Sequence, residues 1–286
     1  MKSVSSKARR ARPLLGTFVD ITAQGAGEAE LHRAIDRAFA AIERVHRLMS
    51  FHYAQSDVSR INRNGFPAGA VVHPWTWQVL KSAQQFARDS DGVFDITVGS
   101  LLSESNHLPR IGNRATGRAK WRDIFLGRNC EVICLRPVIV DLGGIAKGFA
   151  VDRAVEALRH AGIRYGIVNA GGDLRVFGSI SRNVHLRSAT SPGAFSEVLR
   201  LRNRAIATSA TYFEPDALID GRTRRSLKSS ISVTVAAGDC TTADALTKIV
   251  FALREKAAPL LERYRADALI LERDGSPGWM FHTHAT

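Results

Sequence analysis

The stretch "VDLGGIAKGFAVD" (residues 140–152) combines residue types that can hold an anion. An apolar run ends at Asp141, two glycines follow, and Lys147 precedes a helical pattern. Glycines let the backbone approach a ligand closely, and the first turn of a helix offers unpaired N–H groups to an anion. The stretch is not a P-loop, because it lacks that spacing and the serine or threonine after the lysine. An ordinary strand-to-helix turn therefore also fits these residues.

Three other segments place a carboxylate beside glycines or at a helix start. Asp95 lies in "DGVFDITVGSLL", Asp173 follows two glycines in "IVNAGGDLRVFG", and Asp244 lies in "TTADALTKIVFAL". A carboxylate suits the positive end of a helix dipole. However, an acid at a helix start is usually a cap, and Gly-Gly-Asp usually forms a turn. Each segment alone has a purely structural explanation.

Hydrophobic periodicity indicates the elements that must position these residues. It predicts strands at 16–24 and through "WRDIFLG" and "EVICLRPVIVDLG", and further strands or hairpins between residues 165 and 237. It predicts helices over 28–50, 73–92 and 144–161, and one beginning at "CTTADAL". Strand runs outnumber clean βαβ alternation in the second half, which favours an α+β fold with a mixed, largely antiparallel sheet and packed helices.

The chain shows no low-complexity linker and no internal repeat. We therefore expect a single domain over residues 13–273. A basic segment, 1–12, is expected to be disordered before it, and a tail, 274–286, follows it without an assigned role. Because the basic start lacks the apolar core of a signal peptide and no apolar run is long enough to span a bilayer, we expect a cytoplasmic protein.

Composition is that of a globular protein, with 45% hydrophobic and 23% charged residues. The three cysteines provide no disulfide framework, which agrees with a reducing compartment. The net charge of +13 suits a phosphorylated ligand or nucleic acid. No recognisable reading element accompanies the charge, so we do not expect nucleic acid to be the partner.

The motifs acquire meaning in their order along the chain. The segments "LLGTFVDIT", "MSFHYAQSDVSRINR", "GVFDITVGSLL", "VDLGGIAKGFAVDRAVEAL", "IVNAGGDLRVFG", "AIATSATYFE" and "TTADALTKIVFAL" follow one another with characteristic spacing. In this series the chain resembles the FAD:protein FMN transferase (ApbE-like) family over about residues 13–273. The resemblance implies an ApbE-like, T-fold-related architecture and an enzyme that moves FMN from FAD to a threonine of a target protein. The FMN is joined through a phosphoester bond, AMP is released, and a divalent metal, normally Mg²⁺, takes part.

The resemblance also implies roles for individual residues. FAD and an acceptor protein are the implied partners. The metal would be held by the Gly144 carbonyl and the Asp244 carboxylate, oxygen donors that suit magnesium. The implied catalytic residues are Asp244, Lys147 and Lys248. The implied FAD-binding residues are Leu15, His52, Val93, Phe94, Asp95, Asp141 and Lys147.

This sequence departs from the family pattern at the implied metal site. Lys248 stands where relatives carry a threonine that binds the metal, and Thr247 comes one place earlier. One residue along a helix is a rotation of about 100°, so Thr247 cannot simply replace that threonine. Lysine is a point cation that binds phosphate well. Our hypothesis is that Lys248 partly replaces or weakens the metal.

Further departures lie in "ALIDGRTRR" (217–225) and in the first third of the chain. Ala217 stands where relatives have histidine, Gly221 where they have proline, and Arg224 where they have glycine. His52 replaces a frequent tyrosine. The histidines that match no motif are expected at the surface: His73, His107, His160, His185, His282 and His284.

Three alternatives to the transferase remain open from the sequence. Water in place of threonine would make the protein an FAD pyrophosphatase. Lys248 and Ala217 could instead mark a catalytically inactive FAD-binding protein. The positive charge leaves a basic nucleic-acid binder as the third alternative.

Overall fold

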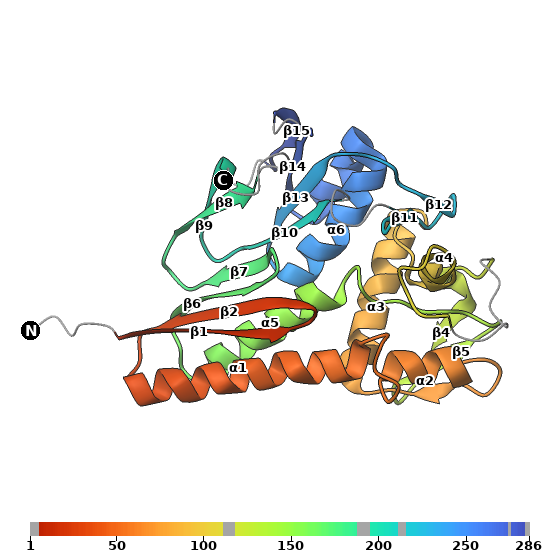
Figure 1. The fold of residues 1–286 in the computed structure, drawn as a ribbon, viewed down its shortest axis with the longest axis horizontal. Coiled ribbons are helices and arrows are strands. Elements are labelled where there is room, and N and C mark those ends of the chain that lie inside the picture. Colours follow the sequence, from red (N-terminus) through yellow and green to blue (C-terminus); the bar gives the residue numbers. More distant parts are fainter. Residues whose placement is uncertain (1–5, 111–117, 188–194, 211–215, 274–275, 284–286) are drawn as a thin grey trace, which may run out of the picture.

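The computed structural model describes residues 6–110, 118–187, 195–210, 216–273 and 276–283, and its main feature is an eight-stranded sheet (Figure 1). All seven ladders of this sheet are antiparallel. In spatial order its strands are β1 (Lys7–Leu14), β2 (Thr17–Gln24), β6 (Tyr165–Ala170), β7 (Asp173–Phe177), β10 (Ala205–Ala210), β13 (Ser232–Ala237), β14 (Asp267–Leu271) and β15 (Pro277–Phe281). The expected α+β class with an antiparallel sheet is confirmed.

Three long helices pack on one face of the sheet: α1 (Glu28–Met49), α5 (Ala146–His160) and α6 (Cys240–Leu253). Helix α5 is central and contacts both α1 and α6. The apolar residues that predicted α1 are its buried face, including Leu31, Ile35 and Ile42. The expected helices at 28–50 and 144–161 are thus confirmed to within two residues at each end.

The opposite face of the sheet is partly covered by a hairpin of β8 (Arg182–Arg187) and β9 (Phe195–Leu201). Side chains alternate along β7, so that Phe177 joins the core under the helices while Val176 joins a second cluster with the hairpin. That second cluster consists of Val176, Leu186, Leu201, Ile206, Leu269 and Leu271.

A smaller layer flanks this sandwich beyond the C-terminal end of α1 (Figure 1). Its sheet has the order β3 (Ala70–Val71), β5 (Glu131–Cys134), β4 (Ile124–Leu126). Around it lie α2 (Asp57–Asn64), α3 (Pro74–Asp89), η1 (Ile96–Val98), α4 (Gly99–Glu104), η2 (Trp121–Asp123) and the hairpin of β11 (Ile219–Asp220) and β12 (Arg225–Ser226). The short helices η3 (Arg254–Ala257) and α7 (Ala258–Arg263) lead from α6 to β14. One hydrophobic cluster contains residues of both layers.

The expectation of a disordered segment over 1–12 is wrong for residues 7–12, which belong to β1. The alternation in this segment buries Ala8 and places Arg10 and Arg12 on the same face, half-buried over the Phe39 ring of α1. The strand pairs with β2 along its whole length, and Arg9 meets Asp20 at 2.7 Å and Arg12 meets Asp36 at 3.0 Å. Residues 1–5 lie outside the described part of the chain.

Two other sequence-based boundaries differ from the structure. The segment 274–286, which was expected to be a tail, supplies β15, the strand that pairs with β14 at the edge of the main sheet. The strand expected through Asp141 ends at Cys134. Beyond it, the Val140 N–H donates to the Asn62 side chain at 2.7 Å and the Asp141 N–H to the Ile96 carbonyl at 2.8 Å. Contacts with α2 and η1 therefore hold this segment in place without a ladder.

Within the described ranges, no helix combines the length and the apolar character that a membrane crossing would need.

Candidate functional site

A cavity of about 820 Å³ lies between the two layers and gathers the residues that the sequence analysis selected. Its wall comes from the β1–β2 turn, the residues after α1, the segment 93–98, the loop 141–147, the end of β10, residues 217–219 and α6. The sequence candidates that line it are Leu15, His52, Val93, Phe94, Asp95, Asp141, Gly144, Lys147 and Lys248. Asp244 is fully buried and lies behind Lys248.

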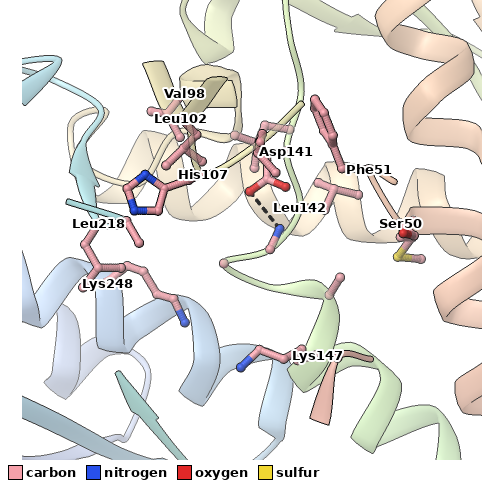
Figure 2. A pocket seen from close by; sticks show the side chains of 18 of the residues that line it. Ser50, Phe51, Val98, Leu102, His107, Asp141, Leu142, Lys147, Leu218 and Lys248 are labelled. Carbon is pink, nitrogen blue, oxygen red and sulfur yellow. Dashed lines mark hydrogen bonds between the residues drawn. The ribbon is translucent and has the colours of Figure 1, made fainter. Parts of the chain in front are cut away.

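Lys147 enters the cavity from the first turn of α5 (Figure 2). The carboxylate of Asp173 lies behind it and pairs with its ammonium group. Its Nζ lies 3.1 Å from Asp173 Oδ2, where Asp173 is 1% exposed and Lys147 is 36% exposed. Burial alone would lower the pKa of Lys147, but the carboxylates of Asp173 and Asp244 outweigh burial and raise it. The amine is therefore an ammonium at neutral pH.

Lys248 approaches the same space from α6, opposite Lys147 (Figure 2). Its Nζ pairs with Asp244 Oδ1 one helical turn earlier, and the lysine side chain is 20% exposed. Long side chains on a helix lean toward its N-terminus, which brings residues i and i+4 together. Burial would raise the pKa of Asp244, but the ammonium groups of Lys248 and Lys147 lower it. Both carboxylates thus lie behind the ammonium groups, which face the cavity.

A close approach of α5 to α6 fixes the position of Asp244. The Gly148 N–H donates to Asp244 Oδ2 at 3.0 Å. A Cβ on Gly148 would lie 2.3 Å from the Cys240 carbonyl oxygen and 2.8 Å from Asp244 Cβ. Gly148, the last glycine of "GGIAKG", is therefore required by the close contact between α5 and α6, and not by contact with a ligand.

The donor set around Asp244 does not fit a magnesium ion. One carboxylate oxygen accepts the Gly148 N–H and the other accepts Lys248 Nζ. A Cβ on Gly144 would lie 3.7 Å from Lys248 Cε, so the lysine passes directly beside the other expected metal ligand. Among the described residues, no group of three His, Cys, Asp or Glu side chains could hold a metal. The resemblance predicts magnesium at a place that the Lys248 side chain occupies.

Thr247 points away from the cavity, as the helical rotation predicted. Its hydroxyl donates to the Asp244 carbonyl at 2.7 Å and lies 2.7 Å from Ser209 Oγ on β10. The side chain is fully buried. Thr247 therefore joins α6 to the main sheet and does not line the cavity.

Asp95 lies on the cavity wall, but its carboxylate is engaged by the protein. It accepts the N–H and the hydroxyl of Thr97, both at 2.8 Å, and the Trp121 N–H at 3.2 Å. Burial raises the pKa of Asp95, although these hydrogen bonds and the nearby Arg224 act to lower it. The arrangement suits a residue that shapes the segment 93–98 and presents Val93 and Phe94 to the cavity.

The departures at Gly221 and Arg224 attach the β11–β12 hairpin to this same segment. The Gly221 N–H donates to the Val93 carbonyl at 3.0 Å, a bond that proline could not make. A Cβ on Gly221 would lie 2.3 Å from Asp95 Cβ. Arg224 donates to the Thr97 carbonyl at 3.0 Å and lies 3.7 Å from Asp95. Gly221 and Arg224 therefore both bond the hairpin to the segment 93–98.

Asp141 extends into the cavity from the loop before α5 (Figure 2). Its Oδ2 accepts the Gly143 N–H at 3.1 Å. Burial raises its pKa, with the Gly143 hydrogen bond and His52 acting in the opposite direction. This carboxyl group can accept hydrogen bonds from polar groups of a ligand.

The cavity also contains residues that the sequence analysis missed. His107 was expected at the surface, but Figure 2 shows its ring in the cavity, on the side of Leu102 and Leu218. Its ring Nδ1 lies 2.9 Å from Ser105 Oγ. Phe51 also lines the cavity. His107 comes from an irregular loop with no motif, so periodicity offered no signal for it.

Comparison with known proteins finds relatives that match most of this chain. The curated FAD:protein FMN transferase of Klebsiella pneumoniae (strain 342) is 26% identical over 263 residues, which cover 83% of this chain and 82% of that protein. The FAD:protein FMN transferase of Vibrio cholerae (serotype O1, Classical Ogawa 395) is 28% identical over 272 residues, or 85% and 80% of the two chains.

Solved structures show the same fold. The crystal structure of the ApbE protein from Thermotoga maritima superposes with a TM-score of 0.83 at 26% identity, covering 98% of this chain and 97% of that one. The flavin transferase ApbE from Vibrio cholerae gives a TM-score of 0.81 at 23% identity and 98% coverage of both chains. Because the model of the ApbE family also matches residues 15–270, and so spans every wall of the cavity, this chain belongs to the ApbE family.

Proposed function

We propose that this protein is an FAD:protein FMN transferase, which moves FMN from FAD to a threonine hydroxyl of an acceptor protein. The observation that carries the proposal is the pair of ammonium groups, Lys147 on α5 and Lys248 on α6, facing one cavity. The similar proteins bearing this activity in their names, which match four-fifths of the chain, support it.

The reaction exchanges one phosphorus–oxygen bond for another. The threonine oxygen bonds to the phosphorus on the FMN side of the pyrophosphate, and the bond from that phosphorus to the AMP phosphate breaks. The products are a threonine–FMN phosphoester and AMP, and one proton is released. Because little other covalent chemistry is required, such a site acts through alignment and through neutralisation of phosphate charge.

The geometry assigns these tasks to named residues. Lys147 and Lys248 would contact the pyrophosphate, since both ammonium groups face the cavity while their carboxylate partners are buried. Charge-assisted hydrogen bonds to phosphate are stronger than neutral ones. Phe94, which the Asp95 and Arg224 contacts hold in place, would pack against the flavin or the adenosine.

The resemblance predicts a magnesium requirement, but the donor set around Asp244 does not fit that ion. We therefore assign the positioning of the pyrophosphate to Lys147 and Lys248. Asp244 acts in this proposal by holding Lys248.

A comparison of flavinylated peptides in source cells tests the proposed function. Deletion of this gene should remove at least one FMN–threonine peptide from the mass spectrum. Re-expression of the wild-type protein should restore that peptide, whereas Lys147→Met should not. An unchanged set of peptides in the deletion strain would overturn the proposal, and release of free FMN alone by the purified protein would favour a pyrophosphatase.

A further inference from the structure

We propose that Lys248 is a built-in replacement for a divalent cation, so that this protein binds the pyrophosphate of FAD without a metal. The inference deepens the proposed function and rests on it. It concerns the source of positive charge at the phosphates.

The ammonium group of Lys248 lies where the resemblance places a metal ion. Lys248 Nζ pairs with Asp244 Oδ1, and the lysine stem runs beside Gly144, where an added Cβ would lie 3.7 Å from Lys248 Cε. These are the two residues expected to coordinate the metal. A cation bound to that carboxylate oxygen would have to displace the ammonium first.

The two lysines are more exposed to the cavity than the carboxylates that pair with them. Asp244 and Asp173 are 0% and 1% exposed, whereas Lys248 and Lys147 are 20% and 36% exposed. Each pair thus presents its positive end to the cavity and keeps its negative end in the protein. The two ammonium groups, one on each of two facing helices, give the cavity wall a positive charge that suits a doubly charged pyrophosphate.

The carboxylate that holds Lys248 is itself fixed by the protein. Asp244 is tied to the α5 backbone through the Gly148 N–H at 3.0 Å. A buried carboxylate is costly without a partner, so removing Lys248 would leave Asp244 undercompensated. The same carboxylate would then be available to a metal ion.

Variants of Lys248 test the proposal, because without the lysine a metal ion can bind to Asp244. The affinity of the purified full-length protein for FAD is measured by flavin fluorescence, in EDTA and again with millimolar MgCl₂. The wild type should bind FAD with the same affinity in both. Lys248→Met should bind about 10–100-fold more weakly in EDTA, the loss expected for one charge-assisted contact.

Lys248→Thr distinguishes the loss of a phosphate contact from a failure of the variant to fold. It should lose FAD affinity in EDTA as Lys248→Met does, but regain most of it with Mg²⁺ or Mn²⁺, because it exposes Asp244 and adds a hydroxyl. Paramagnetic resonance with Mn²⁺ and FAD should show one bound ion in Lys248→Thr and none in the wild type. Recovery with metal shows that the variant is folded.

Two results would overturn the role of Lys248. One is a wild-type protein whose FAD affinity rises more than tenfold with Mg²⁺, or that binds Mn²⁺ stoichiometrically with FAD. The other is unchanged FAD affinity of both Lys248 variants in EDTA. A wild-type protein that binds no FAD in either buffer would overturn the proposed function as well, which distinguishes the two failures.

Discussion

Gly148→Ala tests whether the meeting of α5 and α6 positions the site. The added Cβ would lie 2.3 Å from the Cys240 carbonyl oxygen and 2.8 Å from Asp244 Cβ, both of which are fixed parts of α6. A normal contact needs about 1 Å more, so the helices must separate. Overpacking of this kind costs about 1–3 kcal/mol.

Two further terms set the net size of the effect. Alanine gains about 1 kcal/mol over glycine from helix propensity. Separation of the helices would also break the hydrogen bond from the Gly148 N–H to Asp244, which is worth about 1.5–3 kcal/mol because the acceptor is charged. We therefore expect Gly148→Ala to lower the free energy of unfolding by about 1.5–5 kcal/mol and to weaken FAD binding.

Urea unfolding followed by circular dichroism measures the first effect and flavin fluorescence the second. Gly238→Ala is the matched control, because a Cβ there meets nothing within 4 Å and Gly238 does not need a positive φ. It should change the free energy of unfolding by less than about 0.5 kcal/mol. A Gly148→Ala protein as stable as the wild type would refute the reasoning.

Three further predictions follow from individual contacts. Lys147→Met should weaken FAD binding about 10–100-fold in a fluorescence titration, while Lys256→Met, at an exposed position on η3, should leave it unchanged; equal affinities would contradict a phosphate role for Lys147. Arg224→Met removes the hydrogen bond to the Thr97 carbonyl and should lower both the free energy of unfolding, by about 1–2 kcal/mol, and FAD affinity; loss of neither would show that the hairpin does not hold the segment 93–98. Burial would raise the pKa of Asp89, but hydrogen bonds, first that from Gln85, lower it below its usual value. Its ionised form thus stabilises the fold above the unfolded-state pKa, and this contribution disappears as the pH falls through the lower folded-state pKa. Asp89→Asn should therefore cost about 1 kcal/mol at pH 7 and almost nothing in the most acid solutions that keep the protein folded; a pH-independent difference would be the contrary result.

The sequence predicted the helices of the site well because their signals are local. The apolar spacing of α1 and the helix start at Lys147 depend on residues within a few turns of each other. The same holds for the rotation that turns Thr247 away from the cavity. Local periodicity was therefore sufficient to place Lys147, Asp244 and Lys248 on helices.

The remaining features depend on contacts between distant segments, which a single sequence does not encode in its spacing. The pairing of Lys147 with Asp173 joins a helix to a strand of the main sheet. The strand β1 pairs with β2 over its whole length, and Arg12 reaches Asp36 on α1, whereas composition alone had indicated disorder. His107 lies in the cavity only because an irregular loop folds back over it. The pairing of Lys248 with Asp244 is a local i,i+4 contact that the sequence could suggest, whereas the hydrogen bond from the Gly148 N–H to Asp244 joins two helices and left no signal in the sequence.

Incubation of the purified protein with FAD and an extract of acceptor proteins tests the central claim most directly. The account predicts AMP release together with FMN bound to a protein threonine, both lost in Lys147→Met. Such an outcome would establish the cavity as the place where the pyrophosphate is cleaved and the acceptor is modified. If FAD remained intact with every acceptor fraction, in EDTA and in Mg²⁺ alike, the account would be contradicted.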